Sequence, residues 1–390
     1  MGRTKLHSLE RGQFVAAGDE AKIKLGSLEI GRFIAAFLVM LSHYGPYVDR
    51  HALIPSQAIF KGLVFPGPLG VQYFFVLSGF VMASAHRRDF GKITAVPRFW
   101  WRRICRIYPA YWLALCVPAY YLFGAMTPML TLHLALLDPW ADIEYIPATW
   151  SMRYELAFYI MFSLGMLPYV GKPLLAFWFA FTLWSWCGPL VNLFHPGYMM
   201  AIYRFNQVYA VRFFSPMEFY FFAGLVGGYL YAGQRLGRRA SIVLVLVAVP
   251  LWVLNLPVEG WGVIYGTGPM FQLRMAFITA SCILGFASLE RHRVLRLGKF
   301  AGWAGAMSYP LYIFHEPVLT LVDNELPWGQ YGLPGLYVRF FILIVAMLGL
   351  VALVTFLFDM PVQRGLRRLT RYVAARRAAR VTLRGRCRAA

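Results

Sequence analysis

Apolar runs separated by short polar connections make up most of the chain. A run of about 20 apolar residues forms a helix long enough to cross the roughly 30 Å hydrocarbon core of a bilayer. The pattern therefore predicts an all-α fold, a polytopic membrane protein of about ten transmembrane helices. The expected spans are residues 28–48, 70–86, 108–125, 151–169, 173–190, 214–232, 240–256, 270–288, 303–322 and 336–358.

The composition supports a membrane protein and excludes a nucleic-acid-binding one. The 390 residues are 59% hydrophobic and only 14% charged, whereas about 25% of the residues of a soluble domain are charged. The formal net charge of +21 would suggest a nucleic-acid partner in a soluble protein. Here the basic residues lie between the hydrophobic runs, as the positive-inside rule requires, so no nucleic acid is expected as a partner.

The charge of the connections predicts the topology. Basic connections alternate with acidic or nearly uncharged ones, and an even number of spans with both termini in the cytoplasm satisfies almost all of them. The basic segments are residues 1–27, 87–106, 233–239, 289–300 and the tail that begins at Arg364.

Three regions follow from this topology. Residues 1–27 form a cytoplasmic N-terminal segment without the apolar core of a removable signal peptide, so the first span is expected to direct membrane insertion. Residues 28–360 form the transmembrane domain. Residues 361–390 form a basic cytoplasmic tail, either amphipathic or disordered, on an anionic lipid leaflet.

The five cysteines are scattered and include no C-x-x-C pair. An odd, unclustered set in apolar surroundings argues against a disulfide framework and against a zinc site, so no metal centre is predicted.

Two polar residues in the first span predict an inward-facing surface. Arg32 and His43 are eleven residues apart. Eleven steps of about 100° return the helix to within about 20° of its starting direction, and the two residues lie roughly 16 Å apart along that face. A cation in a membrane helix usually faces the protein interior or a water-filled cavity. We expect this helix to face a polar pathway.

Polar side chains elsewhere in or near the spans are the other candidates for chemistry. Gln72 lies in the second span, among small and aromatic residues. Arg103 and Arg106 belong to the basic, aromatic segment 98–111, which is either an interfacial helix or a site for an anion such as phosphate.

The fourth span carries a carboxylate. Glu155 follows Ser151 by one turn and Trp150 by five residues. At that depth a carboxylate needs a partner from another helix, either His43 or an arginine, and the alternative to a functional site is a structural ion pair.

A second histidine within a span, His315, is preceded by Tyr309 in the segment 308–317. A single histidine on an apolar face is usually a satisfied core residue, but two intramembrane histidines together with a glutamate favour a site.

Together these segments resemble the acyltransferase-3 family of multi-pass membrane O-acyltransferases, from Arg32 to about Arg364. The most specific signature is Arg32-x10-His43. It is supported by Gly70–Phe80, Arg103-x-x-Arg106-Ile107-Tyr108-Pro109, Trp150-Ser151-x-x-x-Glu155, and Ser308-Tyr309-x-x-Tyr312-x-x-His315-x-Pro317.

The resemblance implies an enzyme of the bacterial inner membrane. Such an enzyme transfers an acyl group, commonly acetyl, from cytoplasmic acyl-CoA to a hydroxyl at or beyond the outer face. The implied partners are acyl-CoA as co-substrate, membrane lipids, and a glycan or lipid-linked glycan as acceptor. No tightly bound cofactor is implied.

Residue roles follow from the resemblance together with the chemistry of the side chains. His43 is expected to act as the base that takes the hydroxyl proton, or to carry the acyl group itself. Glu155 would orient His43 or hold the acceptor. Arg32, a catalytic candidate as well, would bind the CoA phosphates together with Arg103 and Arg106. The expected substrate-binding residues are Gln72, Trp150, Ser151, Tyr309 and His315.

A proton-coupled transporter or flippase of a glycan or small metabolite is the main alternative, because such carriers also place His, Glu and Arg along a pathway. The absence of a visible inverted repeat, and the position of the basic aromatic segment at one face, count against it. A non-catalytic scaffold would give no reason for intramembrane His and Glu.

Overall fold

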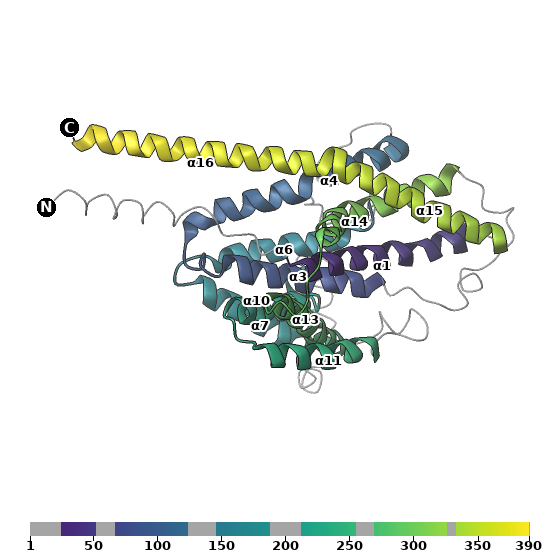
Figure 1. The fold of residues 1–390 in the computed structure, drawn as a ribbon, viewed down its shortest axis with the longest axis horizontal. Coiled ribbons are helices and arrows are strands. Elements are labelled where there is room, and N and C mark those ends of the chain that lie inside the picture. The colour runs from purple at the N-terminus through teal and green to yellow at the C-terminus, as the bar shows by residue number, and fades with distance from the viewer. Residues whose placement is uncertain are drawn as a thin grey trace.

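The computed structural model describes residues 25–51, 67–123, 146–187, 212–254, 269–325 and 333–389. Every regular element in these ranges is a helix (Figure 1). The long helices are α1 (Gly26–His51), α3 (Gly67–His86), α4 (Val96–Phe123), α6 (Thr149–Gly165), α7 (Gly171–Cys187), α10 (Glu218–Ala232), α11 (Arg238–Leu254), α13 (Pro269–Arg291), α14 (Lys299–Glu325), α15 (Leu333–Leu353) and α16 (Met360–Ala389).

A helix overlaps each of the ten predicted spans. Four stretches are long and apolar enough by themselves to cross a membrane, and the last of them joins α15 to the start of α16. The all-α membrane fold is therefore confirmed. That all ten helices cross, and that both termini are cytoplasmic, stay predictions, and residues 1–24 lie outside the described part of the chain. The four stretches are Gly26–Gly45, Gly67–His86, Phe271–Arg291 and Pro334–Val373.

The outer surface of several helices is apolar, which is what lipid requires. On α11, Leu246 is 67% exposed and Val243 is 59% exposed, and on α15 Val345 is 70% exposed. These side chains would be costly in water but not against hydrocarbon chains, so polar groups are the ones that turn inward. The candidate site is consequently built from inward-facing polar residues.

Glycine allows α3 and α10 to lie against each other with their backbones in contact. A Cβ atom on Gly79 would come within 2.1 Å of the Phe221 carbonyl oxygen, and one on Gly224 within 2.0 Å of the Val76 carbonyl oxygen. Small residues at such crossings are the usual means by which membrane helices approach closely. This contact fixes the scaffold behind the site.

A carboxylate from α13 holds the start of α1. Glu290 accepts hydrogen bonds from the backbone N–H of Gly26 (2.7 Å) and of Ser27 (3.0 Å), and from the Ser27 hydroxyl (2.8 Å). The first N–H groups of a helix have no partner within the helix and favour a negative charge. The contact fixes the position of α1, the helix that carries Arg32 and His43.

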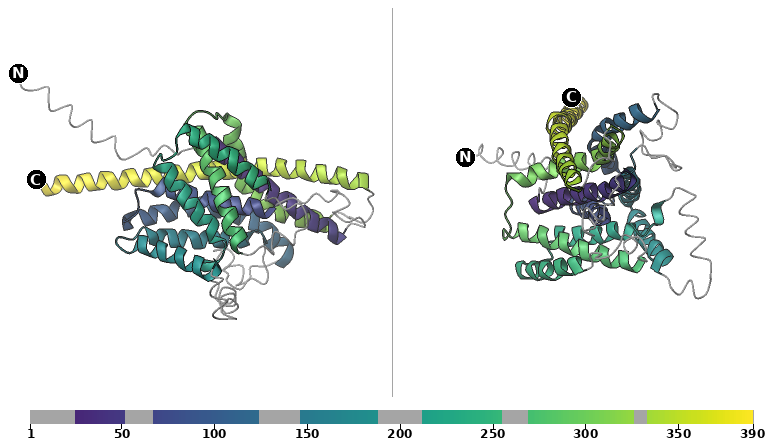
Figure 2. Two further views of the ribbon diagram at one scale, coloured as in Figure 1. Left: turned by 90° about the horizontal axis from the view of Figure 1, so that it is seen from below. Right: turned by 90° about the vertical axis from the view of Figure 1, so that its right-hand side faces the viewer.

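The C-terminal tail forms one helix, α16, in the described residues. A π-helical turn, Val354–Asp359, joins α15 to α16, and α16 extends well beyond the other helices (Figures 1 and 2). Its first half lies along α4. The Trp101 indole N–H donates to Thr370 Oγ1 (2.8 Å), and Gln363 Nε2 donates to the Cys105 carbonyl oxygen (2.6 Å).

Candidate active site

The first group of candidate residues consists of His43 from α1 and of His315 and Glu316 from α14, here called the His–His–Glu cluster. His43 Nε2 lies 3.3 Å from Glu316 Oε1. The two imidazole rings are 5.0 Å apart between centroids. His43 and His315, which are far apart in the sequence, are therefore neighbours in the fold. Glu316, the residue after His315, contacts His43.

Backbone contacts determine how the two imidazoles present their nitrogens. His43 Nδ1 lies 2.8 Å from the Val39 carbonyl oxygen, and His315 Nδ1 lies 2.6 Å from the Tyr312 carbonyl oxygen. A carbonyl oxygen only accepts, so Nδ1 carries the proton in both rings. In a neutral ring, Nε2 is then the nitrogen with a free lone pair.

Exposure separates the roles of the three groups. The His43 side chain is 36% exposed, whereas that of Glu316 is 5% exposed and His315 is fully buried. His43 is therefore the member of the cluster that a substrate can reach. Glu316 and His315 lie behind it.

The start of α6 holds the cluster from the other side. The backbone N–H of Ala148 donates to Glu316 Oε2, so the carboxylate bridges α6 and His43. The Tyr312 hydroxyl lies 2.6 Å from Ser151 Oγ and donates to the Ala148 carbonyl oxygen (3.1 Å). An unpaired N–H at a helix start suits a carboxylate, which explains why this contact forms here.

The second group lies around three arginines and is here called the arginine layer: Arg32, Arg103 and Arg106. Arg32 pairs with Glu29 (3.6 Å), and Arg106 lies 3.9 Å from Asp359 in the π-helical turn. Arg32 and Arg106 lie close enough for their like charges to repel each other, so residues of α1 and α4 come together here.

Aromatic side chains orient the arginines of α4. The guanidinium of Arg103 lies 4.9 Å from the ring centre of Tyr159, and that of Arg106 lies 5.6 Å from the ring centre of Tyr309. Tyr309 in turn donates its hydroxyl to the Ile107 carbonyl oxygen (2.8 Å). Cation–π contacts of this kind stabilise a guanidinium without neutralising its charge.

Glu155 lies with the arginine layer. It accepts hydrogen bonds from the Tyr159 hydroxyl and from Ser78 Oγ (3.4 Å), and it interacts electrostatically with Arg32. The sequence left His43 or an arginine open as the partner of Glu155, and the hydrogen bonds of this carboxylate come instead from Ser78 and Tyr159. The carboxylate beside His43 is Glu316.

Three of the remaining candidates lie at one of these two groups, whereas the contacts described for Trp150 and Gln72 place neither residue in either group. Ser151 and His315 lie at the cluster, and Tyr309 lies at the arginine layer. Trp150 packs on Tyr154, with ring centres 5.9 Å apart. Gln72 is buried on α3, and its Oε1 has no hydrogen-bond partner among the described residues.

Three helices each run past both groups, which places the groups at two depths. Along α1, Arg32 precedes His43 by eleven residues, or about 16 Å. Along α6, Ser151 at the cluster precedes Glu155 at the arginine layer by one turn. Along α14, Tyr309 precedes His315 by six residues. From N- to C-terminus, α1 and α14 therefore pass from the arginine layer to the cluster, and α6 passes from the cluster to the arginine layer.

Glu316 was not among the residues that the sequence singled out. The signal was present, because Glu316 is a carboxylate inside an apolar run and directly follows His315. An ionisable residue in a membrane span is a candidate functional group by default. Its partner, however, is on α1 and is determined by the fold.

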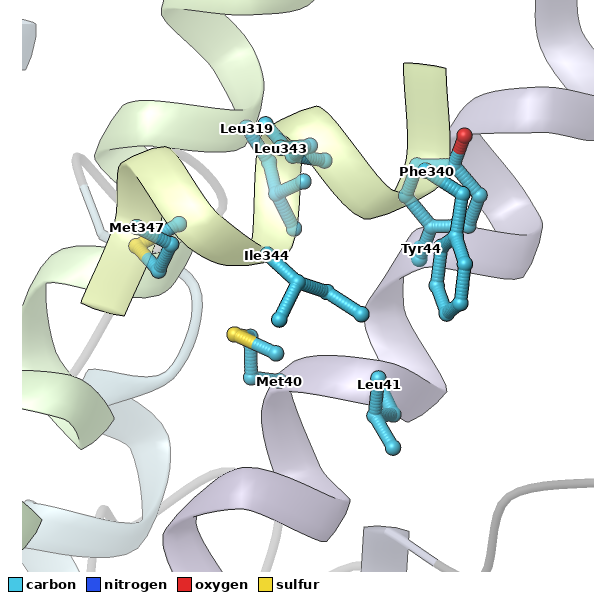
Figure 3. A pocket seen from close by; sticks show the side chains of 8 residues that line it. All are labelled: Met40, Leu41, Tyr44, Leu319, Phe340, Leu343, Ile344 and Met347. Carbon is cyan, nitrogen blue, oxygen red and sulfur yellow. The ribbon is translucent and has the colours of Figure 1, made fainter. Parts of the chain in front are cut away.

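A small pocket between α1, α14 and α15 is lined by apolar side chains and one tyrosine, and its lining includes no carboxylate, imidazole or amine (Figure 3). Tyr44, the residue after His43, points into it. The lining residues are Met40, Leu41, Tyr44, Leu319, Phe340, Leu343, Ile344 and Met347.

Comparison with known families gives the decisive observation: the family described as an acyltransferase domain, acyltransferase-3, matches residues 25–359. The chain belongs to the acyltransferase-3 family. The resemblance inferred from the sequence is thereby confirmed. This acyltransferase is a membrane protein, and both groups of candidate residues lie within the matched region.

Three relatives are similar to parts of this acyltransferase. The exopolysaccharide production protein ExoZ of Rhizobium meliloti is 26% identical over 66% of this chain and 78% of its own. The acyltransferase MdmB of Streptomyces mycarofaciens is 33% identical over 25% of this chain and 28% of its own. Protein 2 in the picA locus of Rhizobium radiobacter is 37% identical over 24% of this chain and 55% of its own. No solved structure matches the chain.

Proposed function

We propose that this protein is an O-acyltransferase of the bacterial inner membrane that moves an acyl group, acetyl in the first instance, from cytoplasmic acyl-CoA to a hydroxyl of a cell-envelope glycan. The observation that carries the proposal is the contact between the accessible His43 and the buried Glu316. A glycan acceptor is supported by the name of the relative ExoZ, an exopolysaccharide production protein.

His43 acts as the general base. Its Nε2 lone pair takes the proton of the acceptor hydroxyl while the hydroxyl oxygen attacks the thioester carbonyl carbon. The imidazolium that forms directs its Nε2–H towards Glu316 Oε1, 3.3 Å away. As the carbon–sulfur bond breaks, the departing thiolate takes this proton, so the products are an ester and a free thiol and His43 returns to its neutral form.

The alternative role of His43 uses the same nitrogen. If Nε2 attacks the thioester itself, the acyl group rests on the imidazole before the hydroxyl takes it. A quench during turnover distinguishes the two routes, because only the second leaves labelled acyl groups on the protein.

The arginine layer binds the donor. Guanidinium groups match phosphate oxygens bidentately, and the aromatic contacts of Arg103 and Arg106 hold them in place. The separation of about 16 Å between Arg32 and His43 suits a long pantetheine arm that carries the thioester away from its phosphates. In this arrangement the phosphates stay at the cytoplasmic side and the thioester reaches the cluster.

The experiment combines chemistry in the cell with chemistry in vitro. Cell-envelope glycans from cells with and without the gene are compared by mass spectrometry for the increment of one acyl group. The purified protein in lipid nanodiscs is then given radiolabelled acetyl-CoA together with the unacylated glycan from the cells that lack the gene, and transfer of label to the glycan is measured. Full transfer by a His43→Ala variant would refute the role of His43. Uptake of a glycan into proteoliposomes without any acyl donor would favour a transporter instead.

A further inference from the structure

The His–His–Glu cluster has the composition of a metal site as well as that of a catalytic pair. His43, His315 and Glu316 each offer one ligand atom, and these atoms all lie within 4.8 Å of one another. Two imidazoles and a carboxylate are a common ligand set of Zn²⁺ in proteins, with the fourth position left open. The scattered cysteines gave no sign of it, because the ligands come from two helices and include no thiol.

Each prospective ligand is already oriented by a second partner. The Nδ1–H of His43 and that of His315 both donate to backbone carbonyl oxygens, and the second oxygen of Glu316 accepts the Ala148 N–H. Histidines that bind metals nearly always donate their other N–H in this way, and the carboxylates that bind metals are likewise hydrogen-bonded. The arrangement leaves two Nε2 lone pairs and one carboxylate oxygen for a common ligand.

His315 supplies the independent observation. It is fully buried, and its Nε2 has no hydrogen-bond partner among the described residues. A buried acceptor without a partner has lost its hydrogen bonds to water and gained none in the protein, and this costs free energy. A metal ion bound to Nε2 would remove that cost, and no role in proton transfer at the exposed His43 requires this nitrogen.

The distances need only a small adjustment. Ligand atoms about 2.0–2.2 Å from a tetrahedral Zn²⁺ lie roughly 3.3–3.6 Å from one another. His43 Nε2 and Glu316 Oε1, at 3.3 Å, already meet this requirement. A ring nitrogen of His315 lies within 4.8 Å of the other two ligand atoms, so it has to approach them by at most about 1.5 Å. The exposed side of His43 gives the metal its entry and its fourth, open position.

We propose that the His–His–Glu cluster is a Zn²⁺-binding site, and that bound zinc inhibits the enzyme. The second part rests on the proposed function, because a metal on His43 Nε2 occupies the lone pair that takes the hydroxyl proton. Zinc binding itself does not depend on that function.

Metal binding is measured on the full-length protein in nanodiscs after removal of metals by a chelator. Zn²⁺ is titrated against a chromophoric competitor, and Co²⁺ serves as a spectroscopic probe of coordination. We expect one equivalent of Zn²⁺ and an intense visible Co²⁺ band. His315→Ala and Glu316→Gln should each weaken binding at least 10- to 100-fold. His292→Ala is the matched control, since His292 Nε2 contacts the Leu236 carbonyl oxygen at another place in the fold.

The outcomes separate the two proposals. Absence of stoichiometric binding to the wild-type protein, or binding that both cluster variants leave intact, overturns the metal site. Binding without loss of acyl transfer, or with a gain, overturns the inhibition. If His43→Ala loses zinc but retains acyl transfer, the proposed function fails and the metal site stands. Gel-filtration profiles identify any variant that does not fold. In that case the zinc titration of the wild-type protein still decides whether the metal site exists.

Discussion

Replacement of Glu316 by Gln tests the catalytic pair with little change of shape. The side chain is 5% exposed, and one oxygen accepts the Ala148 N–H while the other faces His43. Glutamine retains an acceptor for Ala148, so the start of α6 stays in place. What is lost is the negative charge that stabilises the imidazolium of His43.

The magnitude follows from the distance. Two unit charges 3.3 Å apart interact by about 5 kcal/mol at an effective dielectric constant of about 20. Because His43 is partly exposed to solvent and the amide still offers a dipole, we expect about half of this, roughly 2–3 kcal/mol, to be lost in the transition state. That loss lowers kcat by about 30- to 150-fold.

The assay is the initial rate of acyl transfer in nanodiscs with both substrates varied, so that kcat and KM are obtained separately. Glu218→Gln is the matched control, because Glu218 is also fully buried but contacts Thr182 (3.2 Å) in a different part of the bundle. We expect Glu316→Gln to lower kcat and Glu218→Gln to leave it unchanged. A kcat for Glu316→Gln within threefold of the wild type would refute the reasoning.

Three further substitutions test the donor site and the scaffold. Arg103→Ala should raise the KM for acyl-CoA about tenfold with little effect on kcat, by loss of a charged hydrogen bond, and steady-state kinetics with an unchanged KM would remove this arginine from the donor site. Glu290→Gln should lower the stability by about 1–2 kcal/mol, because the N–H of Ser27 loses a charged acceptor; an unaltered midpoint of thermal unfolding in detergent would contradict this. Gly224→Ala should prevent the contact of α3 with α10, since the added methyl would lie 2.0 Å from the Val76 carbonyl oxygen. We expect the Gly224→Ala variant to yield little monodisperse protein. A normal yield and a normal gel-filtration profile would contradict this, because they would show that the two helices have room to separate.

The sequence predicted the parts of the site that depend on one helix. The spacing of Arg32 and His43 determines their common face, because helix geometry alone relates residues eleven positions apart. The positions of the helices were predictable as well, because long apolar runs favour helices that can cross a bilayer. The helical state of residues 361–389 was left open, because a run of arginines is compatible with a helix and with a disordered segment.

Contacts between helices could not be predicted in this way. Glu155 and Glu316 are both carboxylates inside spans, and nothing in their local sequence tells which one reaches His43. The answer depends on how α1, α6 and α14 pack, and thus on contacts such as that of Glu290 with the start of α1. The sequence pointed to His43, His315 and Glu155 but not to Glu316, and tertiary packing determines which carboxylate pairs with His43.

The π-helical turn between α15 and α16 determines how α16 is rotated about its axis relative to α15. A π turn holds an additional residue, and deletion of one residue within Val354–Asp359 would rotate everything after it by about 100°. Gln363 and Thr370 would then swing away from α4, although every arginine of the tail would still be present. The alignment of the C-terminal helix on α4 therefore depends on the number of residues in this turn, and the many arginines of the tail would not restore it.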